Sequence, residues 1–386
     1  MSVRCASGLF AVLFAVSGSD VLAAASGEAT VRVALHSARA EATVASAAPV
    51  RVTAPGSRQT MPGILNVRRD GARVAVNGVR MTSPVRVEPT SSLLALDGTP
   101  LRGAVVLLAR ETGLLIVNEL PLDAYLKGVV PAEVPAAWPS EALKAQAIVA
   151  RTYVLYHKAE RAGREFDVDA TVQSQVYGGM GSEDPRTSAA VEATAGRVVT
   201  HEGRLALTPY HSTSAGPTED AAEVWNVDLP YLKGVECPFD AESPAVRWER
   251  RLPVEEIESA LRDAAYRIGP IATLTPLGRN RSGRVTAVRI LHGEGELILK
   301  GESLRRIIGY QRVPSMRFDV IEFDVDPATR RLAVRLDGGG WGHGVGLCQW
   351  GMKALAERGW SAERILDYYY PGTNVDVSTP RVLRAR

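Results

Sequence analysis

Residues 120–147 decide the fold of this chain and read LPLDAYLKGVVPAEVPAAWPSEALKAQA. The stretch sets one acid, Glu133, between two prolines just ahead of a long helix that the pattern predicts from Ser140 to about Ala162. This helix is apolar around most of its circumference, which indicates that it is buried. The sequence therefore places a single carboxylate beside the expected core of a domain.

A second informative stretch, residues 338–351, reads GGGWGHGVGLCQWG. His343 and Cys348 lie among the glycines of this stretch, and a helix is expected from about Gln349 to Arg358. The two stretches together predict a catalytic carboxylate and a separate polar loop that closes on it.

The whole chain predicts an α+β fold, with mixed helices and antiparallel strands around a cleft. Short alternating runs in residues 26–100 indicate a β-rich N-terminal unit. We expect the catalytic domain in two parts, 101–240 and 319–376, with an inserted α+β subdomain at 241–318 and a tail at 377–386.

Residues 1–25 have the layout of a cleavable secretory signal. Arg4 precedes a short apolar run, and the small residues Ala23, Ala24 and Ala25 follow it. The run is too short to anchor the chain across a bilayer. A buried N-terminal helix is the alternative reading. The signal predicts an extracytoplasmic protein, periplasmic or secreted, with no transmembrane anchor after cleavage.

The net charge argues against one class of partner, and the cysteine content suggests a disulfide or a metal site. The formal net charge of +2 over 386 residues includes no concentrated basic run, so nucleic acid is not an expected partner. Cys5 would leave with the signal, and the mature protein would keep Cys237 and Cys348. An even pair of cysteines in an exported protein is typical of a disulfide or a metal site.

Glu133 has a setting that suits general acid catalysis. Cleavage of a glycosidic bond needs a protonated carboxyl group whose pKa is raised by dry, apolar surroundings. Val130, Val134 and Trp138 provide such surroundings, and the neighbouring prolines restrict the backbone. The alternative is a structural glutamate stabilised by a helix dipole.

Both stretches resemble the stage II sporulation protein D family, which also contains the amidase-enhancer proteins of bacterial cell walls. Further matching blocks are HSTSAG at 211–216, PYL at 230–232 and YYYPGT at 368–373. Several blocks in the same order are more specific than any one of them. The resemblance covers roughly Gly113 to Val375 and implies cell-wall glycan strands as substrate or partner.

The resemblance implies that Glu133 is the acid/base of a peptidoglycan lytic transglycosylase. Such an enzyme protonates the glycosidic oxygen and then takes the proton of the muramic acid 6-hydroxyl as that group attacks the anomeric carbon. One alternative is a non-catalytic wall-binding module that stimulates an N-acetylmuramoyl-L-alanine amidase, its partner. Another is an assembly factor that acts through partner contacts. Retention of Glu133 favours the enzyme.

Several polar residues are candidates for substrate binding, with a structural network as the alternative for each. Lys144, Gln146 and Arg151 match polar positions of the family's helix and would bind sugar hydroxyls or a muramyl carboxylate. The others are Gln173 and Tyr177, on a polar loop with Gln175, and Ser212, Thr213 and Ser214 of the histidine loop, residues 211–216.

His211, Cys237, His343 and Cys348 form a candidate zinc set, because two histidines and two cysteines fill a tetrahedral site. The resemblance implies zinc in some members only, so no cofactor is required and Zn²⁺ is an option. A Cys237–Cys348 disulfide is the alternative. The family usually has glycine where this chain has Ala215, so a positive φ there would strain the loop.

Overall fold

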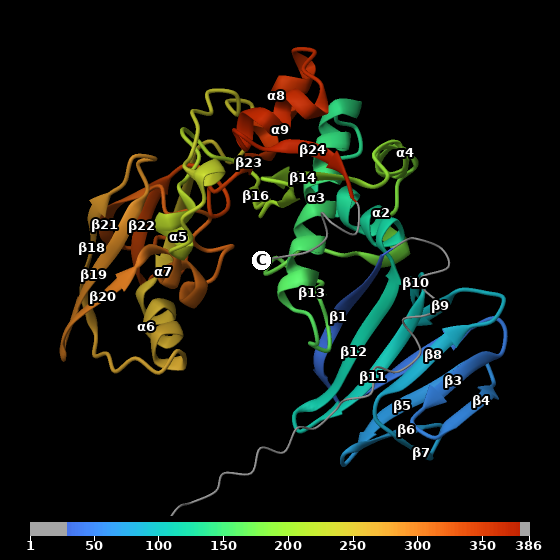
Figure 1. The fold of residues 1–386 in the computed structure, drawn as a ribbon. Helices are drawn as coiled ribbons and strands as arrows, with labels where there is room; N and C mark the ends of the chain where they lie inside the picture. The colour runs from blue at the N-terminus through green and yellow to red at the C-terminus, as the bar shows by residue number, and fades with distance from the viewer. Residues whose placement is uncertain (1–28, 379–386) are drawn as a thin grey trace, which may run out of the picture.

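A computed structural model describes residues 29–378 of the chain (Figure 1). The expected signal peptide at 1–25 lies outside the described residues, as do residues 379–386 of the expected tail. Helices combine with sheets whose strand pairs are antiparallel, apart from β1 with β13 and β16 with β23, and the predicted α+β class is confirmed. Among the described residues, no helix has both the length and the apolar character needed to cross a bilayer.

The N-terminal part is a pair of β-sheets. Their strands are β1 Thr30–Arg39, β2 Glu41–Ser46, β3 Val50–Ala54, β4 Ser57–Met61, β5 Ile64–Asp70, β6 Arg73–Val76, β7 Val79–Thr82, β8 Val85–Pro89, β9 Leu94–Leu96, β10 Thr99–Leu101, β11 Ala104–Arg110, β12 Gly113–Pro121 and β13 Val168–Asp169. One sheet has the order β13-β1-β12-β11-β8-β3-β4 and the other β10-β9-β2-β5-β6-β7. Alternating side chains point between the sheets, as the sequence pattern predicts.

The expected boundary at residue 100 does not separate two units in this structure. Strand β1 pairs along one edge with β12 and along the other with β13, both of which come from the second unit. Strand β11 likewise pairs with β8. The first sheet therefore contains strands from both sides of residue 100, because each edge of β1 finds its hydrogen-bond partners later in the chain.

Helices and short strands form the central part. The helices are α2 Leu122–Glu133, α3 Ser140–Glu160, α4 Pro185–Ala193, α5 Ala221–Trp225, α8 Gln349–Glu357 and α9 Ala362–Tyr369, with 3-10 turns η1 Gly179–Ser182 and η2 Pro230–Leu232. The strands are β14 Arg197–His201, β15 Arg204–Leu205, β16 Tyr210–His211, β23 Leu347–Cys348 and β24 Asn374–Val377. Helix α3 is buried along most of its length, as predicted.

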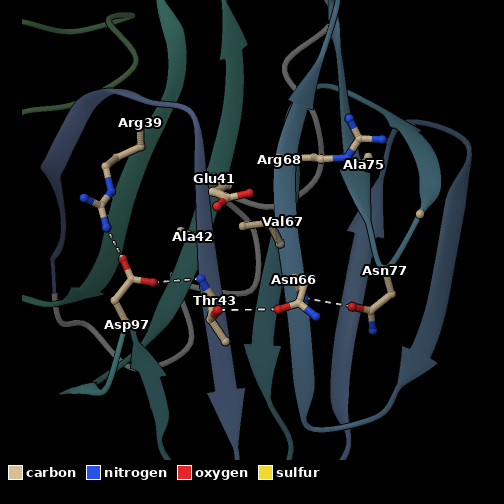
Figure 2. Close-up of a pocket in the computed structure, with 11 residues that line it drawn as sticks. Arg39, Glu41, Ala42, Thr43, Asn66, Val67, Arg68, Ala75, Asn77 and Asp97 are labelled. Atoms are coloured by element: carbon tan, nitrogen blue, oxygen red, sulfur yellow. Dashed lines mark hydrogen bonds and ion pairs between the residues drawn. The ribbon is translucent and has the colours of Figure 1, made fainter.

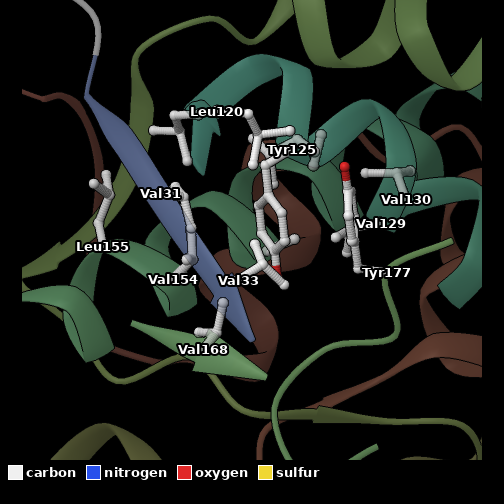
Figure 3. Close-up of a cluster of buried hydrophobic side chains, with 14 of the residues drawn as sticks. Val31, Val33, Leu120, Tyr125, Val129, Val130, Val154, Leu155, Val168 and Tyr177 are labelled. Atoms are coloured by element: carbon white, nitrogen blue, oxygen red, sulfur yellow. The ribbon is translucent and has the colours of Figure 1, made fainter. Parts of the chain in front are cut away.

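One hydrophobic core joins the sheets to these helices. Figure 3 shows Val31 and Val33 of β1 beside Tyr125 of α2, with Val154 of α3 and Tyr177 close by. Helix α2 runs directly on from β12, so this packing fixes the helix that ends at Glu133 against the sheet.

The inserted subdomain has a hydrophobic core of its own, built from residues between Trp248 and Leu336. Its elements are β17 Trp248–Pro253, α6 Val254–Asp263, β18 Ile271–Arg279, β19 Val285–His292, β20 Gly295–Lys300, α7 Gly301–Ile308, β21 Phe318–Val325 and β22 Leu332–Gly338. The expected end at 318 is too early, because β22 lies between β17 and β21 in one sheet.

Candidate active site

Glu133 is the last residue of α2, and its side chain keeps partial exposure. The backbone N–H of Val176 donates to its Oε1 at 3.0 Å. The hydroxyl of Tyr210 and the amide of Gln349 are also close enough to the carboxylate to stabilise its charge. Removal from water raises the pKa of Glu133, and the three donors offset only part of that rise. A carboxyl group with a raised pKa is suited to act as a general acid.

A chain of side-chain hydrogen bonds leads away from Glu133. The Tyr125 hydroxyl donates to Gln175 Oε1 at 3.1 Å, and Gln175 Nε2 donates to the Tyr210 hydroxyl at 3.0 Å. Because the Tyr210 oxygen accepts this bond, its own proton is free to point toward Glu133. Because Tyr125 and Gln175 are buried, this chain fixes the orientation of the Tyr210 hydroxyl.

Gly128 allows the loop that carries Val176 to lie against α2. A Cβ atom at this position would be 2.6 Å from the ring of Tyr177. The Tyr177 hydroxyl donates to Asn118 at 2.9 Å, and both side chains are buried. Tyr177, a predicted substrate-binding residue, thus anchors the loop in the core, and its neighbour Gln173 is exposed.

Gln349 connects Glu133 to the predicted residue Gln146. Gln349 Nε2 lies 3.4 Å from Gln146 Oε1, and Gln146 is completely buried in α3. Gln146 Nε2 has no hydrogen-bond partner among the described residues. Gln146 therefore lies behind Gln349, where it positions the amide that contacts Glu133.

Arg151 and Lys144 lie in structural ion pairs. Arg151 is 0% exposed, and its guanidinium bonds Asp123 at 3.0 Å, so the structure gives it a structural role in place of the predicted sugar contact. Lys144 pairs with Glu141 at 2.7 Å, and Glu141 also accepts the N–H of Ala362 at the start of α9. Helical periodicity identifies the face of α3 that these residues share, but not what covers it.

The histidine loop is held by buried hydrogen bonds. Ser214 and Thr213 are buried, and the Thr213 hydroxyl pairs with that of Ser243 at 2.6 Å. Ser212 retains partial exposure, which leaves its side chain the best placed of the three to meet a ligand. Ala215 has a φ of +56°, so the position where the family usually has glycine does require a left-handed backbone.

The predicted zinc set falls into two groups in the structure. Cys237 and Cys348 are free thiols whose sulfur atoms lie close to each other and to Asp240. His211 is bonded elsewhere, with Nδ1 3.2 Å from the Val345 carbonyl oxygen and Nε2 2.7 Å from the Ser214 hydroxyl. His343 Nδ1 accepts the N–H of Val345. Neither histidine belongs to the cysteine group, and the structure contains no Cys237–Cys348 disulfide.

A pocket of about 290 Å³ lies beside the glycine loop, residues 338–346. Trp225 lines it with an indole that is 38% exposed, and the ring centroid of His343 is 4.8 Å from that of Trp225. Lys300, Asn226 and Asn280 add polar groups to its wall. An aromatic face among hydrogen-bond donors and acceptors suits a sugar ring, which is apolar on its faces and polar at its rim.

A second pocket, of about 680 Å³, lies on the sheet formed by β2, β5 and β6 (Figure 2). Its polar groups bond one another: Arg39 donates to Asp97, and the backbone N–H of Asn66 donates to Asn77 Oδ1. It contains none of the predicted site residues.

Sequence reasoning missed three residues that the structure places at the site. Tyr210 and Gln349 contact Glu133, and Asp240 lies with the two cysteines. Tyr210 and Gln349 are each adjacent in sequence to a predicted residue, His211 and Cys348, which was the available signal. Asp240 carries no such local signal, because its neighbours come from distant segments.

Comparisons with known proteins agree with this layout. Residues 110–201 match a family described as Stage II sporulation protein, and residues 220–346 match a domain of unknown function. The chain is 30% identical to an uncharacterized protein of Brachyspira hyodysenteriae over 78% of each chain. It is 30% identical to stage II sporulation protein D of Bacillus subtilis, over 67% of this chain and 75% of that protein. It is 28% identical to the amidase enhancer of Bacillus subtilis, over 81% of this chain and 50% of that protein.

Proposed function

Because this chain belongs to the stage II sporulation protein D family, we propose that it acts on the bacterial cell wall and cleaves peptidoglycan glycan strands as a lytic transglycosylase. Glu133 is the proposed acid/base. The observation that carries the proposal is the raised pKa of this carboxyl group, which keeps the acid protonated closer to neutral pH.

In the proposed reaction, Glu133 donates its proton to the glycosidic oxygen as the bond to the anomeric carbon breaks. The resulting carboxylate then takes the proton of the muramic acid 6-hydroxyl as that oxygen attacks the same carbon. The product is a 1,6-anhydro sugar, and Glu133 returns to its protonated form. While Glu133 is ionised, the hydroxyl of Tyr210 and the amide of Gln349 stabilise it.

The surroundings of Glu133 suit a proton donor. The groups that lower its pKa, from Val176, Tyr210 and Gln349, are all neutral donors, and their effect is smaller than that of burial. In the proposed reaction the sugar's own hydroxyl is the nucleophile, so one residue can give and then remove the proton.

The glycan would extend from Glu133 toward the glycine loop. Tyr210 lies near Glu133, and the ring centroid of its neighbour His211 is 5.7 Å from that of His343, which lines the pocket that contains Trp225. This pocket would hold a sugar unit remote from the cleaved bond. Such a substrate would place the protein outside the cytoplasm, which agrees with the proposed signal peptide.

A wall-binding module that stimulates a cell-wall amidase is the second candidate. The name of one relative, the amidase enhancer, favours it. A wall-binding module would use the surface around Glu133 for binding, but its function would not require Glu133 to be protonated.

The test is incubation of the mature chain with purified glycan strands, followed by mass spectrometry of the products. We expect anhydro-muramic ends; reducing ends would indicate a hydrolase, and unchanged glycan would support the module. Glu133→Gln should lower the cleavage rate on the order of 10²-fold or more, because an amide cannot deliver the proton. Glu141→Gln, on the adjacent helix, is the control and should cleave normally. Cleavage by Glu133→Gln at the wild-type rate would refute the acid/base role.

A further inference from the structure

Cys237, Asp240 and Cys348 form a buried cluster next to the histidine loop. One ligand atom from each lies within 4.8 Å of the other two, and the residues are 1%, 4% and 0% exposed. Cys237 and Asp240 follow η2, whereas Cys348 is the N-cap of α8. We propose that these three residues bind a zinc ion that ties the two segments together.

The spacing of the ligand atoms fits a tetrahedral zinc ion. Bond lengths of about 2.3 Å to sulfur and about 2.0 Å to oxygen place two such ligands about 3.5 Å apart on the edge of a tetrahedron. Cys348 Sγ lies 3.5 Å from Asp240 Oδ2. The carbonyl oxygen of Ser212 lies 3.6 Å from the same sulfur and is the candidate for the fourth position.

The charge of the cluster also favours a cation. The Asp240 carboxylate is buried, and its Oδ2 accepts two backbone N–H groups, from Ser214 and Ala215, each at 2.8 Å. No lysine, arginine or histidine within residues 29–378 forms an ion pair with it. A buried carboxylate is normally paired with a cation or coordinates a metal. A divalent ion would supply the missing positive charge.

This ligand set replaces the one expected from the sequence. Both ring nitrogens of His211 already have partners in the histidine loop, and His343 lies against Trp225. A disulfide would use the two sulfurs but leave the Asp240 carboxylate buried without a cation. Asp240 is therefore the residue whose contribution separates a metal site from a disulfide.

The zinc would have a structural role beside the active site. Asp240 holds the backbone of Ser214 and Ala215, and Cys348 accepts the N–H of Gly351 in the first turn of α8. Gln349 follows Cys348 and contacts Glu133. An ion here would fix both the histidine loop and the start of α8.

The test is titration of the reduced mature protein with Co²⁺, a spectroscopic substitute for Zn²⁺. We expect a thiolate-to-cobalt absorption band that saturates at one ion per chain and disappears on addition of Zn²⁺. Asp240→Asn keeps the shape of the side chain and should weaken binding by more than about 10-fold. Cys348→Ser should abolish tight binding. The matched controls His211→Asn and His343→Asn should bind the ion as the wild type does.

Three results would overturn the proposal: no thiolate band in the wild-type titration, a band that Asp240→Asn leaves unchanged, or a band that either histidine variant abolishes. Protein isolated without reductant should contain stoichiometric zinc and two thiols after unfolding. A mass lower by two hydrogens, with no metal, would instead identify a disulfide. The wild-type titration and metal analysis test the zinc site even if a variant does not fold. None of these measurements depends on glycan cleavage, so the zinc proposal can fail independently of the proposed function.

Discussion

The side-chain amide of Gln349, the first residue of α8, donates to Gln146 Oε1 of α3 at 3.4 Å. The same amide is close enough to the Glu133 carboxylate, at the end of α2, to lower its pKa. The two N–H groups of one amide can serve both neighbours. The glycine-rich stretch at 338–346 leads into α8, so the end of this stretch is fixed near the carboxylate.

Tyr210→Phe should move the pH profile of cleavage. The Tyr210 hydroxyl stabilises the ionised form of Glu133, so its loss raises the pKa of Glu133 further. A hydrogen bond to a charged group contributes about 1.5–3 kcal/mol to its stabilisation. The acid form would then persist to higher pH, and the basic limb of the kcat/KM profile should shift upward. Tyr153→Phe, whose ring lies 6.3 Å from that of Tyr210, is the control and should keep the wild-type profile.

Gly128→Ala should reduce both stability and cleavage. The added Cβ would lie 2.6 Å from the Tyr177 ring and 3.0 Å from the Gly179 carbonyl oxygen. Overpacking of this kind costs about 1–3 kcal/mol and would displace the loop that carries Val176. Urea unfolding and a cleavage assay measure the two effects. Gly181→Ala, where the added Cβ meets nothing within 4 Å, should change neither; equal behaviour of the two variants would contradict the prediction.

Ala215→Gly should stabilise the protein. Ala215 has a φ of +56°, and the left-handed backbone costs a residue with a Cβ about 1 kcal/mol. Glycine removes that cost but gains entropy in the unfolded chain, so the expected net gain is at most about 1 kcal/mol. Thermal or urea unfolding measures it. Ala328→Gly, at a turn position whose own φ is not positive, should be destabilising by contrast, and a loss of stability in both would count against strain at Ala215.

Stability should fall between pH 7 and pH 5, with a contribution from His343. Burial, together with the charges of Arg305 and Arg284, lowers the pKa of His343 to about 3. In the unfolded chain a histidine titrates near 6.5, so only the unfolded state gains a proton as the pH falls below that value. Neutral His343 therefore makes its full contribution to the free energy of unfolding above pH 6.5, and this contribution would shrink by about 2 kcal/mol by pH 5.

His343→Asn keeps an acceptor for the N–H of Val345 but removes the titration. Free energies of unfolding from urea curves at pH 7 and pH 5 should therefore differ less in this variant than in the wild type. The same difference in both proteins would mean that His343 does not titrate as proposed.

Local sequence signals predicted most of the secondary structure. The apolar pattern and the residues at its ends identified α3, and the end of the glycine-rich stretch identified the start of α8 at Gln349. These features depend on neighbours in sequence, so one chain is enough to reveal them. The left-handed backbone at Ala215 followed from the residue type that the family usually has there.

Contacts between distant segments could not be predicted in the same way. The sequence indicated polar faces on α3 but not that Asp123 and α4 bury Arg151, or that Gln349 covers Gln146. It also paired the cysteines with histidines, because residue types alone do not show which side chains already have partners. Asp240 joined the cysteines only through the tertiary fold.

The position of β1 has a consequence for how the chain acquires its structure. Thr30–Arg39 is the first described strand, yet its partners end at Pro121 and Asp169. Strand β1, which lies between β13 and β12, therefore cannot complete its pairing until about 170 residues are available, which gives the fold a high contact order and predicts slow folding. A chain that cannot close its first sheet early stays unfolded longer, and the export that we propose for this protein would benefit from that delay.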